Sequence, residues 1–136
     1  MNWFNVLITI NLSLATIEVQ RCPSNGESWK LSSDRIGCNK THPYHCLPNN
    51  NLTSYVELCY KHTFFIEGGC LKYLDSGYID QVKCAEFVCG CPDKSYYGDE
   101  LFQYPMCLDL FIPGSCFTAH IDCLKLRVKA LTVRTT

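Results

Sequence analysis

The sequence lacks the patterns that mark the common enzyme and metal-site families. It has no Cys-x-x-Cys, the spacing typical of structural zinc sites and thioredoxin-like redox centres. It also has no Gly-x-Ser-x-Gly, no His-Glu-x-x-His and no glycine-rich phosphate-binding loop. Four histidines are present, but their spacing to the aspartates selects no catalytic pair. We therefore expect no enzymatic activity, no cofactor and no metal.

Long apolar runs are also absent, so we expect no transmembrane segment in this chain and a released rather than anchored protein. The one marked apolar run covers residues 6–15 and ends in Ser13-Leu14-Ala15, small residues that suit a signal peptidase. We expect residues 1–15 to be a signal peptide that is cleaved after Ala15. No lysine or arginine precedes this run and Asn11 interrupts it, so a buried N-terminal strand or helix is the alternative.

Charge is sparse, at 18% of residues, and it is unevenly placed. Residues 16–124 hold eight basic and 13 acidic side chains, whereas four basic residues and no acid follow from Lys125 onward. We expect an acidic body without a nucleic-acid partner, and a basic C-terminal tail over residues 124–136 that could engage polyanions or a lipid surface. Residues 124–130 alternate apolar and basic side chains, which predicts an edge strand protected by lysines; a frayed terminus is the other alternative.

Cysteine is abundant, with 11 residues in 136, a density that marks a small disulfide-stabilised secreted domain. We expect five bridges whose pairing the sequence leaves open, because ten cysteines allow about 945 arrangements. The odd cysteine is expected in the crowded Cys89-Gly90-Cys91 segment, and we assign it to Cys89, either as a free thiol or as a bridge between two chains. The expected framework comprises Cys22, Cys38, Cys46, Cys59, Cys70, Cys84, Cys91, Cys107, Cys116 and Cys123.

A metal centre is the alternative use of these side chains. His42, His45, Cys46, His120 and Cys123 include one His-x-x-Cys and one adjacent His-Cys pair. Structural zinc sites usually employ closely spaced cysteine pairs, which this chain lacks, so disulfides are favoured.

Glycosylation signals and turns support an extracellular β-rich domain. Asn39 and Asn51 each begin an N-glycosylation triplet within turn-rich sequence. Residues 70–74 and 78–84 flank Asp75-Ser76-Gly77, a connection that predicts a hairpin. Residues 44–47 and 54–60 predict a second hairpin, with one or two helical turns as the alternative for 54–60. The expected fold is therefore a small disulfide-rich, mostly β domain of short strands and hairpins with long loops and little helix.

Aromatic residues fall into two groups, which either fill the core or offer a surface for protein or sugar. The groups are Tyr55, Tyr60, Phe64 and Phe65, and Tyr96, Tyr97, Phe102 and Tyr104.

Short motifs follow one another in order between about Cys22 and Cys123. They are Gly37-Cys38, Tyr44-His45-Cys46-Leu47-Pro48-Asn49, Val56-Glu57-Leu58-Cys59-Tyr60, Gly69-Cys70-Leu71, Cys84-x-x-Phe87, Gly90-Cys91-Pro92 and Tyr104-Pro105-x-Cys107. This series resembles the cysteine-rich extracellular domains of uncharacterised bivalve mollusc proteins. The resemblance implies a receptor-like or adhesive ectodomain, commonly followed by a membrane helix and a cytoplasmic tail, and a framework that does not include Cys89. The present chain instead has a basic tail after Cys123, as in a secreted relative or a truncated or spliced form.

Together these patterns predict a signal peptide over residues 1–15, a cysteine-rich extracellular domain over residues 16–123 and a basic tail over 124–136. The expected function is that of a secreted or cell-surface binding module for an extracellular protein or glycan, with a disulfide-linked homodimer through Cys89. A secreted effector, such as a protease inhibitor or a toxin-like or antimicrobial protein acting through the basic tail, is the alternative.

Overall fold

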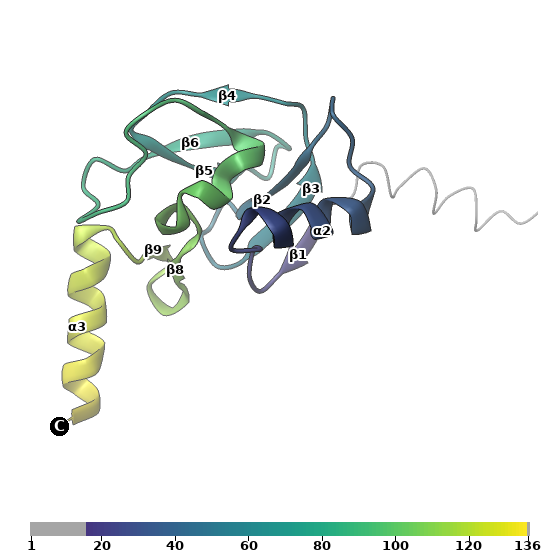
Figure 1. Cartoon of the computed structure of the whole chain (residues 1–136). Helices are drawn as coiled ribbons and strands as arrows, with labels where there is room; N and C mark the ends of the chain where they lie inside the picture. Colours follow the sequence, from purple (N-terminus) through teal and green to yellow (C-terminus); the bar gives the residue numbers. More distant parts are fainter. Residues whose placement is uncertain (1–15, 136) are drawn as a thin grey trace, which may run out of the picture.

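The computed structural model describes residues 16–135 (Figure 1), so the expected signal peptide and its cleavage site after Ala15 lie outside the described residues. The strands are β1 (Ile17–Val19), β2 (Tyr44–Pro48), β3 (Tyr55–Cys59), β4 (Phe64–Phe65), β5 (Gly69–Tyr73), β6 (Ile79–Lys83), β7 (Tyr96–Tyr97), β8 (Leu110–Phe111) and β9 (Cys116–Phe117). The helices are α2 (Gly26–Ile36), α3 (Ile121–Thr135) and the 3-10 helices η1 (Gly98–Gln103), η2 (Pro105–Leu108) and η3 (Ile112–Gly114).

The central sheet has three antiparallel strands in the order β1-β3-β2. β2 and β3 pair from Tyr44 opposite Cys59 to Pro48 opposite Tyr55, which confirms the hairpin and the strand predicted for residues 54–60. All five residues of β2 are buried. Such a strand needs cover on both faces, and α2, η1 and β5 all pack against β2.

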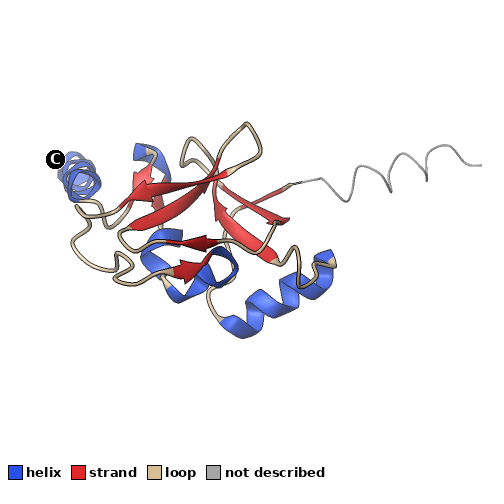
Figure 2. Ribbon diagram, turned by 90° about the horizontal axis from the view of Figure 1, so that it is seen from above, coloured by secondary structure: helices blue, strands red, loops and turns tan. Residues whose placement is uncertain are grey.

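The hairpin predicted around Asp75-Ser76-Gly77 is also confirmed, because β5 and β6 pair along their whole length. Gly77 has φ +93°, a conformation that glycine adopts without steric cost, and the Leu74 amide donates to the Tyr78 carbonyl at 2.8 Å across the turn. Two shorter ladders, β4 with β7 and β8 with β9, complete the strands of the described part of the chain (Figure 2).

α2 is not among the elements predicted from the sequence, although its ends carry recognisable signals. The Asn25 side chain accepts a hydrogen bond from the Ser28 amide at 2.8 Å, and the Ser28 hydroxyl accepts one from the Asn25 amide at 3.3 Å. Gly37, at φ +87°, ends the helix. The helix buries Trp29 edge-on against Tyr44, with ring centroids 5.0 Å apart.

The edge strand predicted for residues 124–130 is wrong, because these residues belong to α3. A strand needs a neighbour to satisfy its main chain, whereas a helix satisfies most of its own N–H and C=O groups. Leucine, lysine, arginine and alanine are good helix formers, so this segment forms a helix without any pairing partner. The basic tail is therefore helical over its described length.

The core is built largely around cystines. Cys46, Cys70, Cys84, Cys107 and Cys123 are each at most 1% exposed, and the first four pack in one cluster with Tyr44, Leu47, Leu71, Leu101, Tyr96 and Phe117. The small, mostly β, disulfide-rich class predicted from the sequence is confirmed. Within residues 16–135, no helix combines the length and the apolar character that a membrane crossing requires.

Candidate functional site

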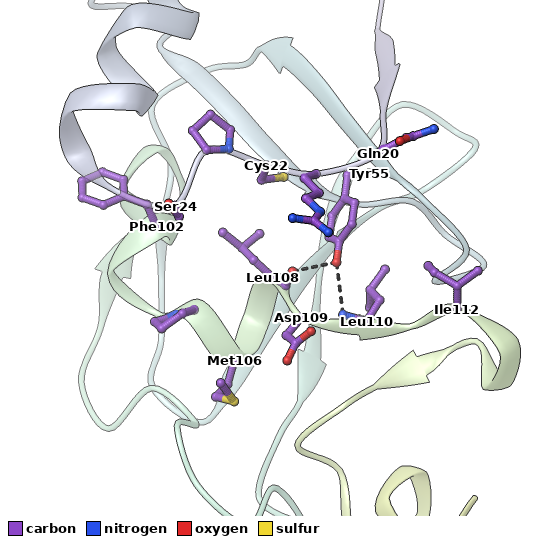
Figure 3. Close-up of a pocket in the computed structure, with 13 residues that line it drawn as sticks. Gln20, Cys22, Ser24, Tyr55, Phe102, Met106, Leu108, Asp109, Leu110 and Ile112 are labelled. Atoms are coloured by element: carbon purple, nitrogen blue, oxygen red, sulfur yellow. Dashed lines mark hydrogen bonds between the residues drawn. The ribbon is translucent and has the colours of Figure 1, made fainter. Parts of the chain in front are cut away.

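A groove lies beside β1 and the residues that follow it (Figure 3). It consists of two hollows of about 530 and 550 Å³, and Gln20 and Ile112 line both. Figure 3 shows the first hollow, in which Gln20 lies on one side, Met106 and Asp109 lie on the other, and Tyr55 lies between them. The groove is thus formed where the N-terminal strand meets the segment that contains η2 and β8.

Tyr55 fixes the two sides of the groove to each other. Its hydroxyl donates to the Leu108 carbonyl at 2.7 Å and accepts from the Leu110 amide at 3.1 Å. Burial raises the pKa of Tyr55, so the phenol remains protonated in the neutral range. Because both hydrogen-bonding directions of the hydroxyl are occupied, Tyr55 serves as a structural tie and is not placed to act as a base or nucleophile.

Charged groups of both signs line the groove. Arg21 and Asp109 border the first hollow, and Glu18 borders the second. In residues 16–135 no ion pair joins Arg21 to Asp109, so both side chains remain available to a bound molecule. Met106, Leu110 and Ile112 add apolar surface. This mixture suits recognition of a molecule that has polar and apolar parts.

The hydrogen-bonding direction of β3 can be read from its ladder with β2. Two main-chain bonds bracket that ladder, from the Tyr60 amide to the Pro43 carbonyl at 3.1 Å and from the Asn49 amide to the Ser54 carbonyl at 3.0 Å. Because hydrogen-bonded pairs alternate along an antiparallel ladder, the even-numbered residues of β3 bond toward β2. The odd-numbered residues of β3 therefore bond toward β1.

This alternation leaves the main chain of Glu18 unpaired at the sheet edge. Ile17 lies opposite Glu57 and Val19 lies opposite Tyr55, so these two residues of β1 bond to β3. The N–H and C=O of Glu18, between them, point away from β3. No strand pairs with this side of β1 in the described part of the chain. The edge offers one donor and one acceptor next to the hollow that Glu18 itself lines.

The ten cysteines assigned to the framework form five disulfides, and Cys89 is the one cysteine without a bridge. Cys89 is exposed, in the loop that the bridge between Cys84 and Cys91 closes. The five pairs are Cys22–Cys46, Cys38–Cys59, Cys70–Cys107, Cys84–Cys91 and Cys116–Cys123. Three of them join segments at least 21 residues apart in sequence, so they hold distant parts of the chain together.

Both asparagines of the glycosylation triplets are exposed. The Asn39 side-chain oxygen accepts from the Thr41 amide at 3.0 Å and from the His42 amide at 2.8 Å, which shapes a tight turn. In the described residues its side-chain nitrogen, to which a glycan would be attached, makes no hydrogen bond. Asn51 lies in the turn between β2 and β3. The backbone therefore leaves both positions accessible to a modifying enzyme.

The histidines and cysteines considered above as possible metal ligands do not form a common cluster. Cys46 and Cys123 belong to different disulfides, and His45 is 1% exposed. In residues 16–135, only Glu86, His120 and Asp122 bring three potential ligand atoms within 4.8 Å of one another.

Other contacts already engage the histidine of that trio. The Asp122 amide donates to Nδ1 of His120 at 3.1 Å. Its Nε2 lies 3.4 Å from a Glu86 oxygen. Glu86 and Asp122 are exposed, and exposed acidic groups often lie close together without a metal ion, so this cluster alone does not indicate a metal site.

The buried hydrogen bonds of two polar side chains, Glu57 and His45, were not predicted from the sequence. Glu57, 2% exposed on β3, accepts from the Tyr44 hydroxyl at 2.6 Å and from Arg35 of α2 at 2.8 and 2.9 Å. His45 donates from Nδ1 to the Pro43 carbonyl at 2.9 Å, while in the described residues its buried Nε2 has no hydrogen-bond partner. Burial lowers the pKa of His45. No local pattern predicts the contacts of Glu57, because its partner Arg35 lies 22 residues away in the sequence.

The aromatic residues divide between core and surface. Tyr55 and Tyr96 are buried, whereas Phe64 is 59% and Tyr97 38% exposed. His62 stacks on Tyr97 with ring centroids 3.9 Å apart. Neither aromatic group lies wholly in the interior or wholly on the surface.

The groove itself was not predicted from the sequence. Residues 17–19 alternate in polarity, but three residues are too few to mark a strand, and nothing local connects them to Ile112. Comparisons of the chain with family models, with curated proteins and with solved structures found no match.

Proposed function

We propose that this chain is a secreted, cysteine-rich binding module that recognises an extended polypeptide segment along the free edge of β1. The observation that carries the proposal is the unpaired main chain of Glu18 beside the groove. An exposed sheet edge binds an extended peptide by adding it as a further strand, with main-chain hydrogen bonds for affinity and side-chain hollows for selectivity.

The lining of the groove suits such a ligand. A peptide strand laid against β1 would meet apolar surface at Leu110 and Ile112 and charged groups at Arg21 and Asp109. Glycans share some of this chemistry, but they lack the regular alternation of amide and carbonyl groups that a strand edge pairs with.

Binding without catalysis is supported by the same residues. The titratable side chains of the groove are Glu18, Arg21, Tyr55 and Asp109. Tyr55 is fixed by its two main-chain hydrogen bonds, and arginine stays protonated, so neither provides a base. The groove also contains the hydroxyls of Ser24, Thr53 and Ser54, but in the described residues neither Glu18 nor Asp109 is hydrogen-bonded to any of them, so no nucleophile is paired with a base.

Secretion is supported by the leader-like residues 1–15, by the five disulfides and by the exposure of Asn39 and Asn51. The resemblance to cysteine-rich ectodomains of bivalve molluscs agrees with this proposal. An oxidising compartment is required to form and keep such a framework.

A variant of Glu18 tests the groove. Peptides are first selected by display on the secreted wild-type chain, and their binding is then compared between Glu18→Pro and Glu18→Ala. Proline removes the outward amide but no bond to β3, so we expect it to weaken binding by at least about tenfold, whereas alanine retains the amide and binds within about twofold. Selected peptides that bind the proline variant as tightly as wild type would contradict recognition through the β1 edge.

We also propose a disulfide-linked homodimer through Cys89. The thiol is exposed, and its neighbour Val88 is 56% exposed, so the loop is accessible to a second copy. Electrophoresis of the wild-type chain without reductant should give a dimer that reductant and Cys89→Ser each abolish. A monomer under both conditions would exclude it.

A further inference from the structure

α3 projects away from the rest of the protein (Figure 1). Its first turn is held by the Cys116–Cys123 disulfide and by a hydrogen bond from the Ile121 amide to the Glu86 carbonyl at 3.1 Å. Leu126 also reaches η3, since its side chain lies beside Gly114. Beyond this attachment the helix extends for about two more turns, in which Val128 and Leu131 are 57% and 61% exposed. The projecting part is therefore available to another molecule.

An apolar stripe runs along the side of α3 that faces away from η3. Ile121, Leu124, Val128 and Leu131 follow one another at intervals of three, four and three residues, the spacing of a two-helix seam. At about 100° per residue, Val128 lies about 140° around the helix from Cys123, which faces the domain. Val128 is 57% and Ile121 38% exposed. The stripe therefore presents aliphatic side chains to solvent.

Basic residues border this stripe on both sides. In the heptad that places Ile121 and Val128 at a and Leu124 at d, Lys125 occupies e and Arg127 occupies g. The helix has no acidic residue after Asp122 in its first turn. A second α3 would bring basic flanks against basic flanks, whereas glutamates or aspartates at the same positions of a partner helix would pair with them.

We propose that α3 is one half of a two-helix interface, and that its partner is an acidic amphipathic helix of another protein. A narrow stripe of aliphatic side chains at a and d fits a helix–helix seam. A helix lying in a membrane surface carries a broader apolar face and often aromatic residues, and α3 has no aromatic residue. Leu126, on the opposite side, would also remain outside such a membrane. This interface is independent of the groove at β1.

Designed peptides test the proposal on the secreted full chain. The probe has isoleucine at a, leucine at d and glutamate at e and g; its control carries lysine at e and g. We expect fluorescence anisotropy to show the acidic peptide binding at least about tenfold more tightly, with an affinity that falls as salt rises. Binding of the chain to phosphatidylcholine vesicles with and without phosphatidylglycerol tests the membrane as an alternative partner. Analytical sedimentation of the chain alone tests self-association.

Matched variants distinguish binding through the apolar stripe from a general effect of net charge. Val128→Asp places an acid in the stripe and should weaken acidic-peptide binding by at least about tenfold, whereas Ala130→Asp, with the same net charge off the stripe, should change it by no more than about threefold. The double variant Lys125→Glu with Arg127→Glu should reverse the preference to the lysine peptide, whether or not the aspartate variants fold normally.

Equal binding of both peptides, or no effect of Val128→Asp, would overturn the proposal. Preferential binding to anionic vesicles would assign the helix to a membrane instead, and self-association that Val128→Asp abolishes would assign it to a second copy; either result overturns the acidic-helix partner.

Discussion

Removing one exposed arginine should destabilise this protein far more than its exposure suggests. The Arg35 side chain is 56% exposed, and an exposed ion pair contributes about 0–1 kcal/mol. Its partner is different, because the Glu57 side chain is only 3% exposed. In Arg35→Met the carboxylate would keep the Tyr44 hydroxyl but lose its only opposite charge among the described residues.

The expected magnitude follows from this asymmetry. Stranding a buried charge by removing its partner costs about 3–5 kcal/mol, and solvent that reaches the vacated Arg35 position offsets part of that cost. We therefore expect Arg35→Met to lower the free energy of unfolding by about 3 kcal/mol. Adding Glu57→Gln removes the stranded charge, and the glutamine oxygen can still accept the hydrogen bond from the Tyr44 hydroxyl. The free energy of unfolding of the double variant should therefore be only about 1 kcal/mol below that of wild type.

Guanidinium unfolding without reductant measures this difference with the disulfides intact. Trp29 is the only tryptophan after residue 15, and it packs on Tyr44 next to Glu57, so its fluorescence follows the docking of α2. Unchanged m-values would allow the midpoints to be compared directly. A loss below about 1 kcal/mol for Arg35→Met, or a double variant less stable than the single, would refute the argument that Glu57 is desolvated.

Three further predictions concern His45, Gly90 and the Cys70–Cys107 bridge. Burial lowers the pKa of His45 below its ordinary value of 6.5, so the unfolded chain binds the proton more readily; unfolding midpoints measured against pH should fall as pH drops below about 6.5, and His45→Phe should flatten that decline. Gly90→Ala should lower the thermal midpoint with a loss of about 1–2 kcal/mol, because Gly90 has φ +84° and a β-carbon there would overlap a methionine side chain of η2. Replacing Cys70 and Cys107 together by serine opens a bridge spanning 37 residues and should cost about 4 kcal/mol in guanidinium unfolding, against about 2 kcal/mol for a bridge that spans seven; equal losses would contradict the loop-closure explanation.

Those parts of the fold that depend on local sequence were predictable. The β5–β6 hairpin follows from a turn that needs a glycine at Gly77, and the β2–β3 hairpin follows from strand-favouring residues such as Tyr55 and Val56 beside an asparagine-rich turn. α2 carries an Asn25-x-x-Ser28 start and a Gly37 end, but these signals alone do not predict the helix, because it buries only Trp29 and has no strong apolar face.

The segment after Cys123 shows why polarity alternation alone is ambiguous. Residues 124–130 alternate as a strand would, yet Leu124 and Val128 also recur at helical intervals from Ile121. In the described residues no strand pairs with this segment, and a helix satisfies most of its main-chain groups without one. Whether residues 124–130 form a strand or a helix depends on whether a neighbouring strand pairs with them, and the sequence of this segment does not show that.

The candidate groove and the pairing of the cysteines could not be predicted, because both depend on contacts between distant segments. Tyr55 meets Leu108 across 53 residues, and Arg35 meets Glu57 across 22. No local pattern specifies such contacts. Residue type identified the chemistry available, whereas the topology decided which side chains meet.

The central claim is that five specific disulfides hold this fold and leave one thiol free. Alkylation of the unreduced protein followed by peptide mass spectrometry tests it directly. The account predicts bridged peptides for Cys22–Cys46, Cys38–Cys59, Cys70–Cys107, Cys84–Cys91 and Cys116–Cys123, with Cys89 either alkylated or joined to the Cys89 of a second chain. A folded protein with most thiols alkylated, or with Cys89 bridged to one of the ten, would contradict it.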